Sequence, residues 1–350
     1  MRIAIVGGGV MGCATALALT GRGAEVVVLE RAVPGAEASS AAAGILGAQA
    51  ELHGREGDAR LFVQARNGWP SWAAALREAS GVDVGWRRSG VLRIALSERE
   101  GAELTQEVAW QRDHGMRAEV LGPAAAREVE PELGETVLSA AHFPDDAQVD
   151  PPALLRSLMA ALALDRRATI RSGTTVERLL VEADRCVGVK LDDGELRAEA
   201  TVLAAGSWSS LVPGVPATVP PVRPVRGQIV LLDERPPRLR TIVFGAGGYV
   251  VPRGDGRVLC GSTMEHVGFR REVTAGGVQA ILASALACAP SLAAAQLAGT
   301  WSNFRPHAEN GALVGASSLE GLFLATGHHR NGILLAKTTA DAVTAAILGG

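Results

Sequence analysis

The chain has 350 residues, of which 47% are hydrophobic, and its formal net charge is −3 at pH 7. This size allows one large unit or two closely joined domains to bury a core. Because positive and negative charges nearly cancel, the sequence shows neither the basic surface typical of nucleic-acid binding nor a polybasic membrane patch, so we expect a small-molecule partner.

The four cysteines are far apart and form neither a Cys-x-x-Cys pair nor a cluster with histidine at metal-ligand spacing. We therefore expect no metal site, and this cysteine usage favours a reducing cytoplasm. Residues 3–19 are apolar enough to suggest a signal peptide, but the run contains four glycines and continues into a second predicted strand. No other stretch is apolar and long enough to span a bilayer, so a soluble, cytoplasmic protein is expected.

The first thirty residues predict a βαβ unit. Residues 2–6 and 25–29 are short apolar runs typical of buried strands, and residues 10–21 form a helix of small apolar residues between them. The chain therefore begins like a nucleotide-binding sheet.

A dinucleotide signature lies inside this unit. Residues 7–12 read Gly-Gly-Gly-Val-Met-Gly between the strand and the helix, and Glu30 follows the last glycine by 18 residues. Gly7 permits the tight turn, Gly9 allows the backbone to approach a pyrophosphate, and Gly12 allows the helix to pack closely on the strand. Glu30 can accept hydrogen bonds from both ribose hydroxyls and would repel a 2′-phosphate, which argues against NADP. The alternative is a glycine-rich structural turn.

The rest of the chain reads as further strands and helices. A helix is expected over residues 58–79, with Trp69 and Trp72 in the core and an interruption at Pro70. The pattern then changes to a strand (91–96) and a helix (98–114). A helix over 151–163 leads through residues 169–170 into strands at 176–181, 187–191 and 201–205, and further strands are expected at 228–232, 249–252 and 258–261. A helix with Val278, Ile281, Leu282, Ala285 and Leu286 on one face follows, and the tail (322–348) reads as a strand, a glycine-rich turn and a long helix.

This order favours two domains built from interleaved segments. The strands between 176 and 205 resemble part of a nucleotide-binding sheet, and a proline-rich stretch over 213–224 marks a crossing between domains. The expected ranges are 1–85, 146–220 and 305–350 for the nucleotide domain, and 86–145 and 221–304 for the other.

Three further segments favour FAD over NAD. Residues 39–44 are a run of small residues suited to backbone approach along an extended cofactor. Residues 204–208 close a strand with a glycine turn, where a second contact with the dinucleotide is expected. Residues 327–332 are expected to open the terminal helix, whose N-terminus can stabilise negative charge. Ordinary loop chemistry is the alternative for each segment alone.

Taken together, these segments resemble the FAD-dependent D-amino-acid oxidase superfamily and, within it, the glycine oxidases of the thiazole-biosynthesis type. The resemblance covers nearly the whole chain, and its most specific block is Arg-Asn-Gly-Ile-Leu-Leu-Ala at residues 330–336. Its other carriers are residues 6–12, 39–46, 205–209, 224–228, 249–253, 261–265, 304–306 and 327–329. The resemblance implies an α/β fold (α+β overall), in which a Rossmann-like FAD-binding domain is interleaved with a mixed-sheet substrate-binding domain.

The resemblance also implies the site residues. Tyr249, Arg305 and Arg330 occupy the catalytic, substrate-binding positions, and a guanidinium can hold an α-carboxylate by paired charged hydrogen bonds. The alternatives are a strand tyrosine with its hydroxyl in solvent and two surface arginines in ion pairs. The implied contacts to non-covalent FAD are Gly7, Gly9, Val10, Met11, Gly12, Glu30, Arg31, Ser39, Ser40, Ala43, Gly44, Leu46, Val176, Ala205, Gly206, Trp208, Arg305, His329, Arg330, Asn331, Gly332, Ile333 and Leu334.

The implied reaction is hydride transfer from the α-carbon of a small amine or amino acid to the flavin. Oxygen would then yield hydrogen peroxide, and water would hydrolyse the imine to an oxo-acid and ammonia. No Ser/His/Asp or Cys/His constellation accompanies these residues, which agrees with chemistry carried by the cofactor. Four histidines are candidate neighbours of the site: His53, His307, His328 and His329. For each of them a purely structural role is the alternative.

Several residues depart from the superfamily's pattern. Asn303 and Phe304 replace a smaller pair, Gly247 stands where a histidine is common, and a bulky His329 precedes Arg330. The identity of the substrate among glycine, sarcosine and larger D-amino acids therefore stays open, as does a homo-oligomer. No cysteine lies near residues 304–306, which disfavours covalently attached flavin. The alternatives are a flavin-dependent D-amino-acid dehydrogenase that passes electrons to a quinone or carrier, and a non-catalytic FAD-binding subunit.

Overall fold

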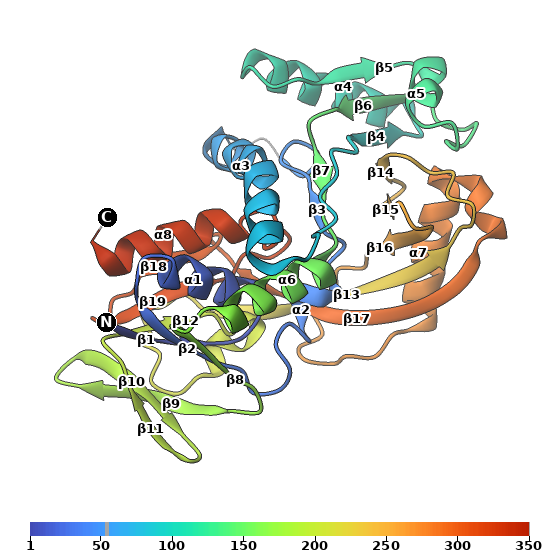
Figure 1. Ribbon diagram of the computed structural model, residues 1–350. Coiled ribbons are helices and arrows are strands. Elements are labelled where there is room, and N and C mark those ends of the chain that lie inside the picture. The colour runs from blue at the N-terminus through green and yellow to red at the C-terminus, as the bar shows by residue number, and fades with distance from the viewer. Residues whose placement is uncertain (53–55, 350) are drawn as a thin grey trace.

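The computed structural model describes residues 1–52 and 56–349 and contains two large sheets (Figure 1). The first has six strands in the order β18-β19-β12-β1-β2-β8, and all neighbours in it are parallel except β18 and β19. Their bounds are β1 (Arg2–Val6), β2 (Glu25–Leu29), β8 (Ala168–Arg171), β12 (Ala200–Leu203), β18 (Leu313–Ala316) and β19 (Leu322–Thr326). The carboxyl ends of β1, β2, β12 and β19 therefore meet at one edge, which is where ligands bind in such sheets.

Helices cover one face of this sheet and form the largest core cluster (Figure 1). They are α1 (Val10–Thr20), α3 (Glu56–Ser80), α6 (Pro151–Leu164) and α8 (Ala336–Leu348). Trp69 and Trp72 are buried in this core, as predicted. The interruption predicted at Pro70 is wrong, because α3 is continuous and the buried Trp69, Trp72 and Leu76 hold both of its halves against the core.

The second sheet has eight strands in the order β17-β13-β16-β15-β14-β4-β6-β5. It is mixed, because β14 and β4 are parallel and the other neighbours are antiparallel. Its strands are β4 (Val91–Ala95), β5 (Glu119–Leu121), β6 (Ser139–Phe143), β13 (Val222–Asp233), β14 (Ile242–Gly245), β15 (Gly248–Pro252), β16 (Arg257–Gly261) and β17 (Gln296–Ala308), and its helices are α4 (Glu98–Asp113), α5 (Pro123–Val129), α7 (Ala275–Cys288) and η2 (Pro290–Ala294). The predicted apolar face of α7 packs on this sheet through the buried Ile281 and Ala285.

The strands predicted over 176–181 and 187–191 do not join the nucleotide sheet. They belong to a separate antiparallel sheet of β9 (Val176–Glu182), β10 (Arg185–Leu191) and β11 (Gly194–Arg197). The expectation is wrong because Ala183 and Asp184, both at positive φ, form a two-residue hairpin that pairs β10 antiparallel to β9. This small sheet packs on the six-stranded sheet through the cluster that contains Leu179, Val189 and Leu203.

Short elements connect the two large sheets. They are α2 (Ala38–Ala41), β3 (Ile45–Leu46), β7 (Ala147–Gln148) and η1 (Gly206–Leu211). Strand β17 runs without interruption through residue 305, where a change of domain was expected, and it pairs with β13 along its length. The domain boundary predicted at residue 305 therefore lies inside a strand.

The tail differs from its prediction at one point. Residues 327–332 do not open the terminal helix, because α8 begins at Ala336. Gly327 and His329 have positive φ, and the N–H of His329 donates to the carbonyl of Pro306 at 2.7 Å. The chain is thus held in turns beside β17 before the helix starts.

Candidate functional site

The three predicted glycine-bearing turns line one cavity of about 350 Å³ between the two large sheets. Gly7 and Gly9 contribute from the first turn, Gly206 from the second and Gly332 from the third. Tyr249, Arg305 and Arg330 line the same cavity. The nucleotide signature and the predicted catalytic residues, which are far apart in the sequence, therefore share one site.

The first turn has room for glycine only. A Cβ at Gly7, whose φ is +110°, would lie 2.5 Å from the carbonyl oxygen of Ala204, and a Cβ at Gly12 would lie 1.9 Å from that of Gly7. Strand β12 and helix α1 can therefore approach the turn closely, as a dinucleotide site requires. The hydroxyl of Ser39 accepts a hydrogen bond from the N–H of Val10, the first residue of α1, at 2.9 Å.

Glu30 is fixed at the carboxyl end of β2. Its Oε2 accepts from the N–H of Gly8 and its Oε1 from the N–H of Ala32, both at 2.9 Å. Each carboxylate oxygen keeps a further lone pair for a ribose hydroxyl. Arg31 lies with its guanidinium carbon 4.1 Å from the centre of the Trp208 ring, and both residues line the cavity.

These residues fit the expected FAD. The glycine turn brings the N-terminus of α1, a favourable place for phosphates, to the cavity, and Glu30 lies at the end of β2, where a ribose is held in such sites. In addition, His328 lines the cavity and its buried Nδ1 has no hydrogen-bond partner within the described residues, while its Nε2 lies 2.8 Å from the Oγ1 of Thr339. An unpartnered buried nitrogen in a cavity wall is typical of a site that a bound group completes.

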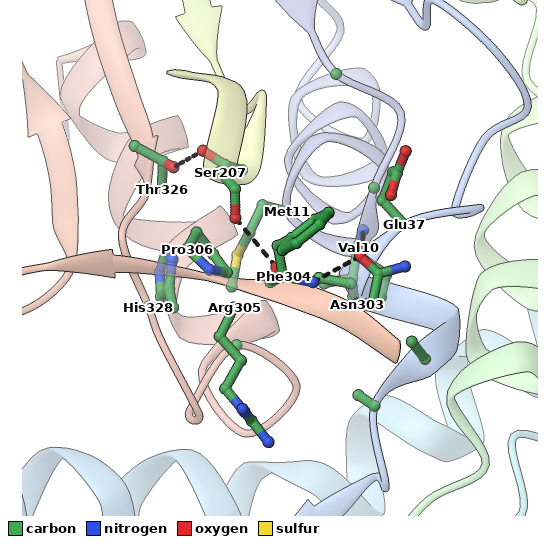
Figure 2. A pocket seen from close by; sticks show the side chains of 18 of the residues that line it. Val10, Met11, Glu37, Ser207, Asn303, Phe304, Arg305, Pro306, Thr326 and His328 are labelled. Atoms are coloured by element: carbon green, nitrogen blue, oxygen red, sulfur yellow. Dashed lines mark hydrogen bonds between the residues drawn. The ribbon is translucent and has the colours of Figure 1, made fainter. Parts of the chain in front are cut away.

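Arg305 lies on β17 and points away from Phe304, on the other side of the strand (Figure 2). Its guanidinium donates to the Oγ of Ser262 at 2.6 Å and to the carbonyl of Thr263 at 3.1 Å. Burial lowers the pKa of Arg305 from its ordinary value, and Tyr249 opposes this shift. Arginine keeps its charge at neutral pH, so this guanidinium brings positive charge into the cavity.

Tyr249 lies close to this arginine in the cavity wall. Its side chain is buried, and burial raises the pKa of its hydroxyl above the ordinary value, with Arg305 opposing the shift. Strand β16 makes room for the ring, since a Cβ at Gly261 would lie 2.6 Å from it. A protonated hydroxyl can donate a hydrogen bond to an anionic group beside Arg305.

Arg330 is paired with a carboxylate that the sequence interpretation missed. Its Nη2 donates to the Oε1 of Glu51 at 2.6 Å, and Glu51 raises the pKa of Arg330. Glu51 lies five residues after the predicted contact block of residues 39–46 and lines the cavity. An acid five residues after a predicted cofactor contact block was the available signal.

Five predicted contacts are absent from the cavity lining: Gly12, Ser40, Leu46, Asn331 and Leu334. Leu46 and Leu334 are buried in the core, and the carbonyl of Leu334 accepts from the indole of Trp69. The other predicted contacts line the cavity. Of the candidate histidines, His328 and His329 line it, and His53 lies outside the described residues. His307 packs edge-to-face against His329, with ring centres 4.9 Å apart.

A second cavity of about 740 Å³ adjoins the first. Both are lined by Glu51, Tyr249, Ser262, Arg305 and Arg330, so these five side chains stand where the two cavities meet. The second cavity continues between helix α4 and the β14–β15 turn. A ligand bound at these five side chains would therefore lie between the first cavity, which contains the glycine turns, and the second cavity.

Neither a metal site nor a membrane-spanning helix is present in the part of the chain that the structure describes. In the described ranges, no group of three or more His, Cys, Asp or Glu side chains is arranged to hold a metal ion. Likewise, over residues 1–52 and 56–349, none of the helices has both the length and the apolar character needed to cross a membrane.

Comparison with known proteins agrees with the site. Residues 2–346 match the family described as FAD dependent oxidoreductase (DAO). The chain is 36% identical over 341 residues to the glycine oxidase of Geobacillus kaustophilus, covering 96% of this chain and 90% of that protein. It is also 38% identical over 344 residues to the bifunctional protein ThiO/ThiG of Trichormus variabilis, of which it spans only 51%.

Solved structures give the same result. The crystal structure of glycine oxidase from Bacillus cereus superposes with a TM-score of 0.93 at 32% identity, covering 99% of this chain and 95% of that one. That of iminodiacetate oxidase from Chelativorans sp. superposes with a TM-score of 0.90 at 25% identity, covering 99% of this chain and 95% of that one. The predicted fold, a Rossmann-like cofactor domain with a mixed-sheet substrate domain, is confirmed.

Proposed function

This chain belongs to the FAD dependent oxidoreductase family, and we propose that it is an oxidase that deaminates glycine or a similarly small amine or amino acid. The reaction uses FAD and O₂ and yields an oxo-acid, ammonia and hydrogen peroxide. The observation that carries this proposal is the single cavity in which the glycine turn of a dinucleotide site meets the cationic side chain of Arg305. The glycine oxidases it resembles over nearly its whole length support the same reaction.

We assign the cofactor to the part of the cavity between the six-stranded sheet and α2. The turn of residues 7–12 and the N-terminus of α1 would hold the pyrophosphate, and Glu30 would accept from the ribose hydroxyls. When bound, FAD supplies the hydride acceptor. The domain ranges given above are retained as a proposal, with β17 shared between the two units.

The substrate carboxylate is assigned to Arg305 and Tyr249. The guanidinium attracts the carboxylate, and the hydroxyl of Tyr249 donates a second hydrogen bond to it. Because Arg305 is itself held by Ser262 and Thr263, the carboxylate is fixed in one orientation, and this orients the α-carbon. Positioning of this kind is the main contribution that the chain makes to the reaction.

The two histidines that line the cavity add no positive charge to it at neutral pH. Burial lowers the pKa of His328 to about 4, and burial together with Arg305 lowers that of His329 to about 4. Both rings are therefore neutral at pH 7. The carboxylate of a substrate is then directed to the arginines and not to a histidine.

A peroxide-coupled screen of the purified holoprotein tests the proposal. Glycine, sarcosine and paired D- and L-amino acids are the probes, and we expect a yellow protein that releases peroxide with glycine or another small member of the set. Bleaching of the flavin in air without peroxide would assign a dehydrogenase instead. A holoprotein that is neither bleached nor turned over by any probe would contradict the proposal.

Two further expectations remain proposals. The four cysteines are unpaired and buried within the described part of the chain, which supports a reducing cytoplasm as the location. A homo-oligomer is retained as a proposal, and gel filtration with light scattering would test it.

A further inference from the structure

The two arginines of the site differ in the charge of their partners. Arg305 donates to a hydroxyl and a backbone carbonyl, both neutral. Arg330 donates to the Glu51 carboxylate at 2.6 Å. Among the described residues, the ion pairs include one at Arg330 and none at Arg305. The positive charge of Arg330 is thus compensated by Glu51, whereas no carboxylate of the described residues forms an ion pair with Arg305.

A substrate carboxylate should therefore bind Arg305 alone. To bind Arg330 as well, it would have to displace Glu51, whose side chain is only 11% exposed and would lose its cationic partner in a largely buried place. Two carboxylates sharing the space between the arginines would also repel each other. Arg330 is consequently a poor second anchor for the carboxylate.

Glu51 is held in place by a buried network. It is the last residue of a turn whose Gln49 and Ala50 N–H groups both donate to the carboxylate of Asp146. Asp146 in turn forms an ion pair with Arg66 at 3.0 Å, and both side chains are buried. A turn anchored in this way presents the Glu51 carboxylate to the cavity at a fixed position.

One oxygen of Glu51 remains available to a ligand. Oε1 accepts from Arg330, and in the described part of the structure Oε2 has no hydrogen-bond partner. Glu51 lines both cavities, as does Arg305, and it is close enough to Arg305 to oppose the lowering of its pKa. An amino acid whose carboxylate is bound by Arg305 thus has an anionic acceptor within the same space.

We propose that Glu51 binds the amino group of the substrate, and that Arg330 is a positioning residue that holds Glu51 and does not bind the substrate carboxylate. The N–H bonds of the amino group donate to Glu51 whether the amine is protonated or neutral. Carboxylate and amine are then fixed from two sides, which orients the α-carbon between them. This inference rests on the proposed amine oxidase function.

Glu51→Gln in the FAD-loaded protein tests it, with glycine and acetate as probes. Acetate is glycine without its amino group, and the glutamine oxygen can still accept from Arg330, so the turn is preserved. Glycine affinity is measured from the glycine dependence of flavin bleaching without oxygen, and acetate affinity from its competitive inhibition of that bleaching. Glu182→Gln, the same change at an exposed residue of β9, is the matched control.

We expect Glu51→Gln to weaken glycine binding by about tenfold or more, which is the loss typical of a charged hydrogen bond. Acetate should bind with unchanged or higher affinity. If glycine and acetate both bind more tightly, Glu51 only competes with the carboxylate and the proposal is overturned. If both weaken equally, or neither changes, Glu51 has no selective contact with the amine and the proposal is also overturned. Failure of the oxidase function would appear separately, as a wild-type holoprotein that no amine bleaches. If another amino acid replaces glycine in the peroxide screen, it and its acid without the amino group serve as the probe pair.

Discussion

Gly227 leaves the space in which the Arg305 guanidinium lies, and filling that space should inactivate the enzyme without unfolding it. A Cβ at Gly227 would lie 2.3 Å from Nη1 of Arg305, whereas ordinary contact begins near 3.4 Å. The guanidinium must therefore retreat by the difference, about 1 Å, and a misplacement of that size costs about 100-fold in rate where a group orients substrate. Because the clashing atoms are the far end of a long, flexible side chain, the guanidinium can shift away from Ser262 and Thr263 while the strands β13 and β17 stay in place.

We expect Gly227→Ala to retain FAD and its thermal unfolding midpoint but to lose about 100-fold in kcat/KM. Gly299→Ala is the matched control, because Gly299 lies on the same strand pair and its added Cβ would meet nothing within 4 Å. Flavin absorbance per chain, thermal unfolding and the peroxide-coupled rate are measured for both variants. A Gly227→Ala enzyme within about threefold of wild type would refute the reasoning that the position of Arg305 sets the rate.

Three further perturbations follow from the same structure. Gly12→Ala places a Cβ 1.9 Å from a backbone carbonyl, so the protein should lose bound flavin, whereas Gly21→Ala, at 3.4 Å from its nearest neighbour, should keep its yellow absorbance. Burial gives His328 a pKa of about 4 in the folded protein, against about 6.5 in the unfolded chain, so the unfolded state binds more protons between these pH values. The contribution of His328 to the free energy of unfolding is therefore complete above about pH 6.5 and falls by up to about 3 kcal/mol as the pH is lowered towards 4. Urea unfolding between about pH 7 and pH 5 checks this, and a His328→Asn protein with the same pH slope as wild type would contradict it. Asp146→Ala leaves Arg66 buried without its carboxylate and should lower the free energy of unfolding by about 3–5 kcal/mol; a loss below about 1 kcal/mol would show that this pair does not hold the turn.

Local sequence patterns were sufficient for the first βαβ unit of the cofactor-binding sheet. The turn of residues 7–12 is determined by neighbours within the first thirty residues, and the helix and strands predicted around it coincide with α1, β1 and β2 to within one residue. Glu30 could be placed because parallel strands end at one edge of a sheet. These features depend on short-range geometry, which is why the sequence alone predicts them.

Features that depend on pairing between distant segments could not be predicted in this way. The hairpin at Ala183 and Asp184 uses two non-glycine residues at positive φ, so the turn carries no glycine signal. Glu51 is functionally interpretable only once Arg330, far along the chain, is seen to be its partner. The resemblance supplied Arg305 and Arg330 as site residues, but it could not reveal that their charges are compensated differently.

The difference between the two arginines depends on how β17 is bordered. This strand is the outermost of its sheet, so one edge of its backbone has no strand beside it. The turn before α8 lies along that edge, where the N–H of His329 donates to the carbonyl of Pro306, the residue directly after Arg305. An otherwise open strand edge is thereby covered, and the same contact sets the position of Arg330 relative to Arg305. Because Arg330 is tied to β17 while its side chain reaches the Asp146-anchored turn of Glu51, the positions of Glu51 and Arg305 in the cavity are set by contacts within the chain and not by the substrate.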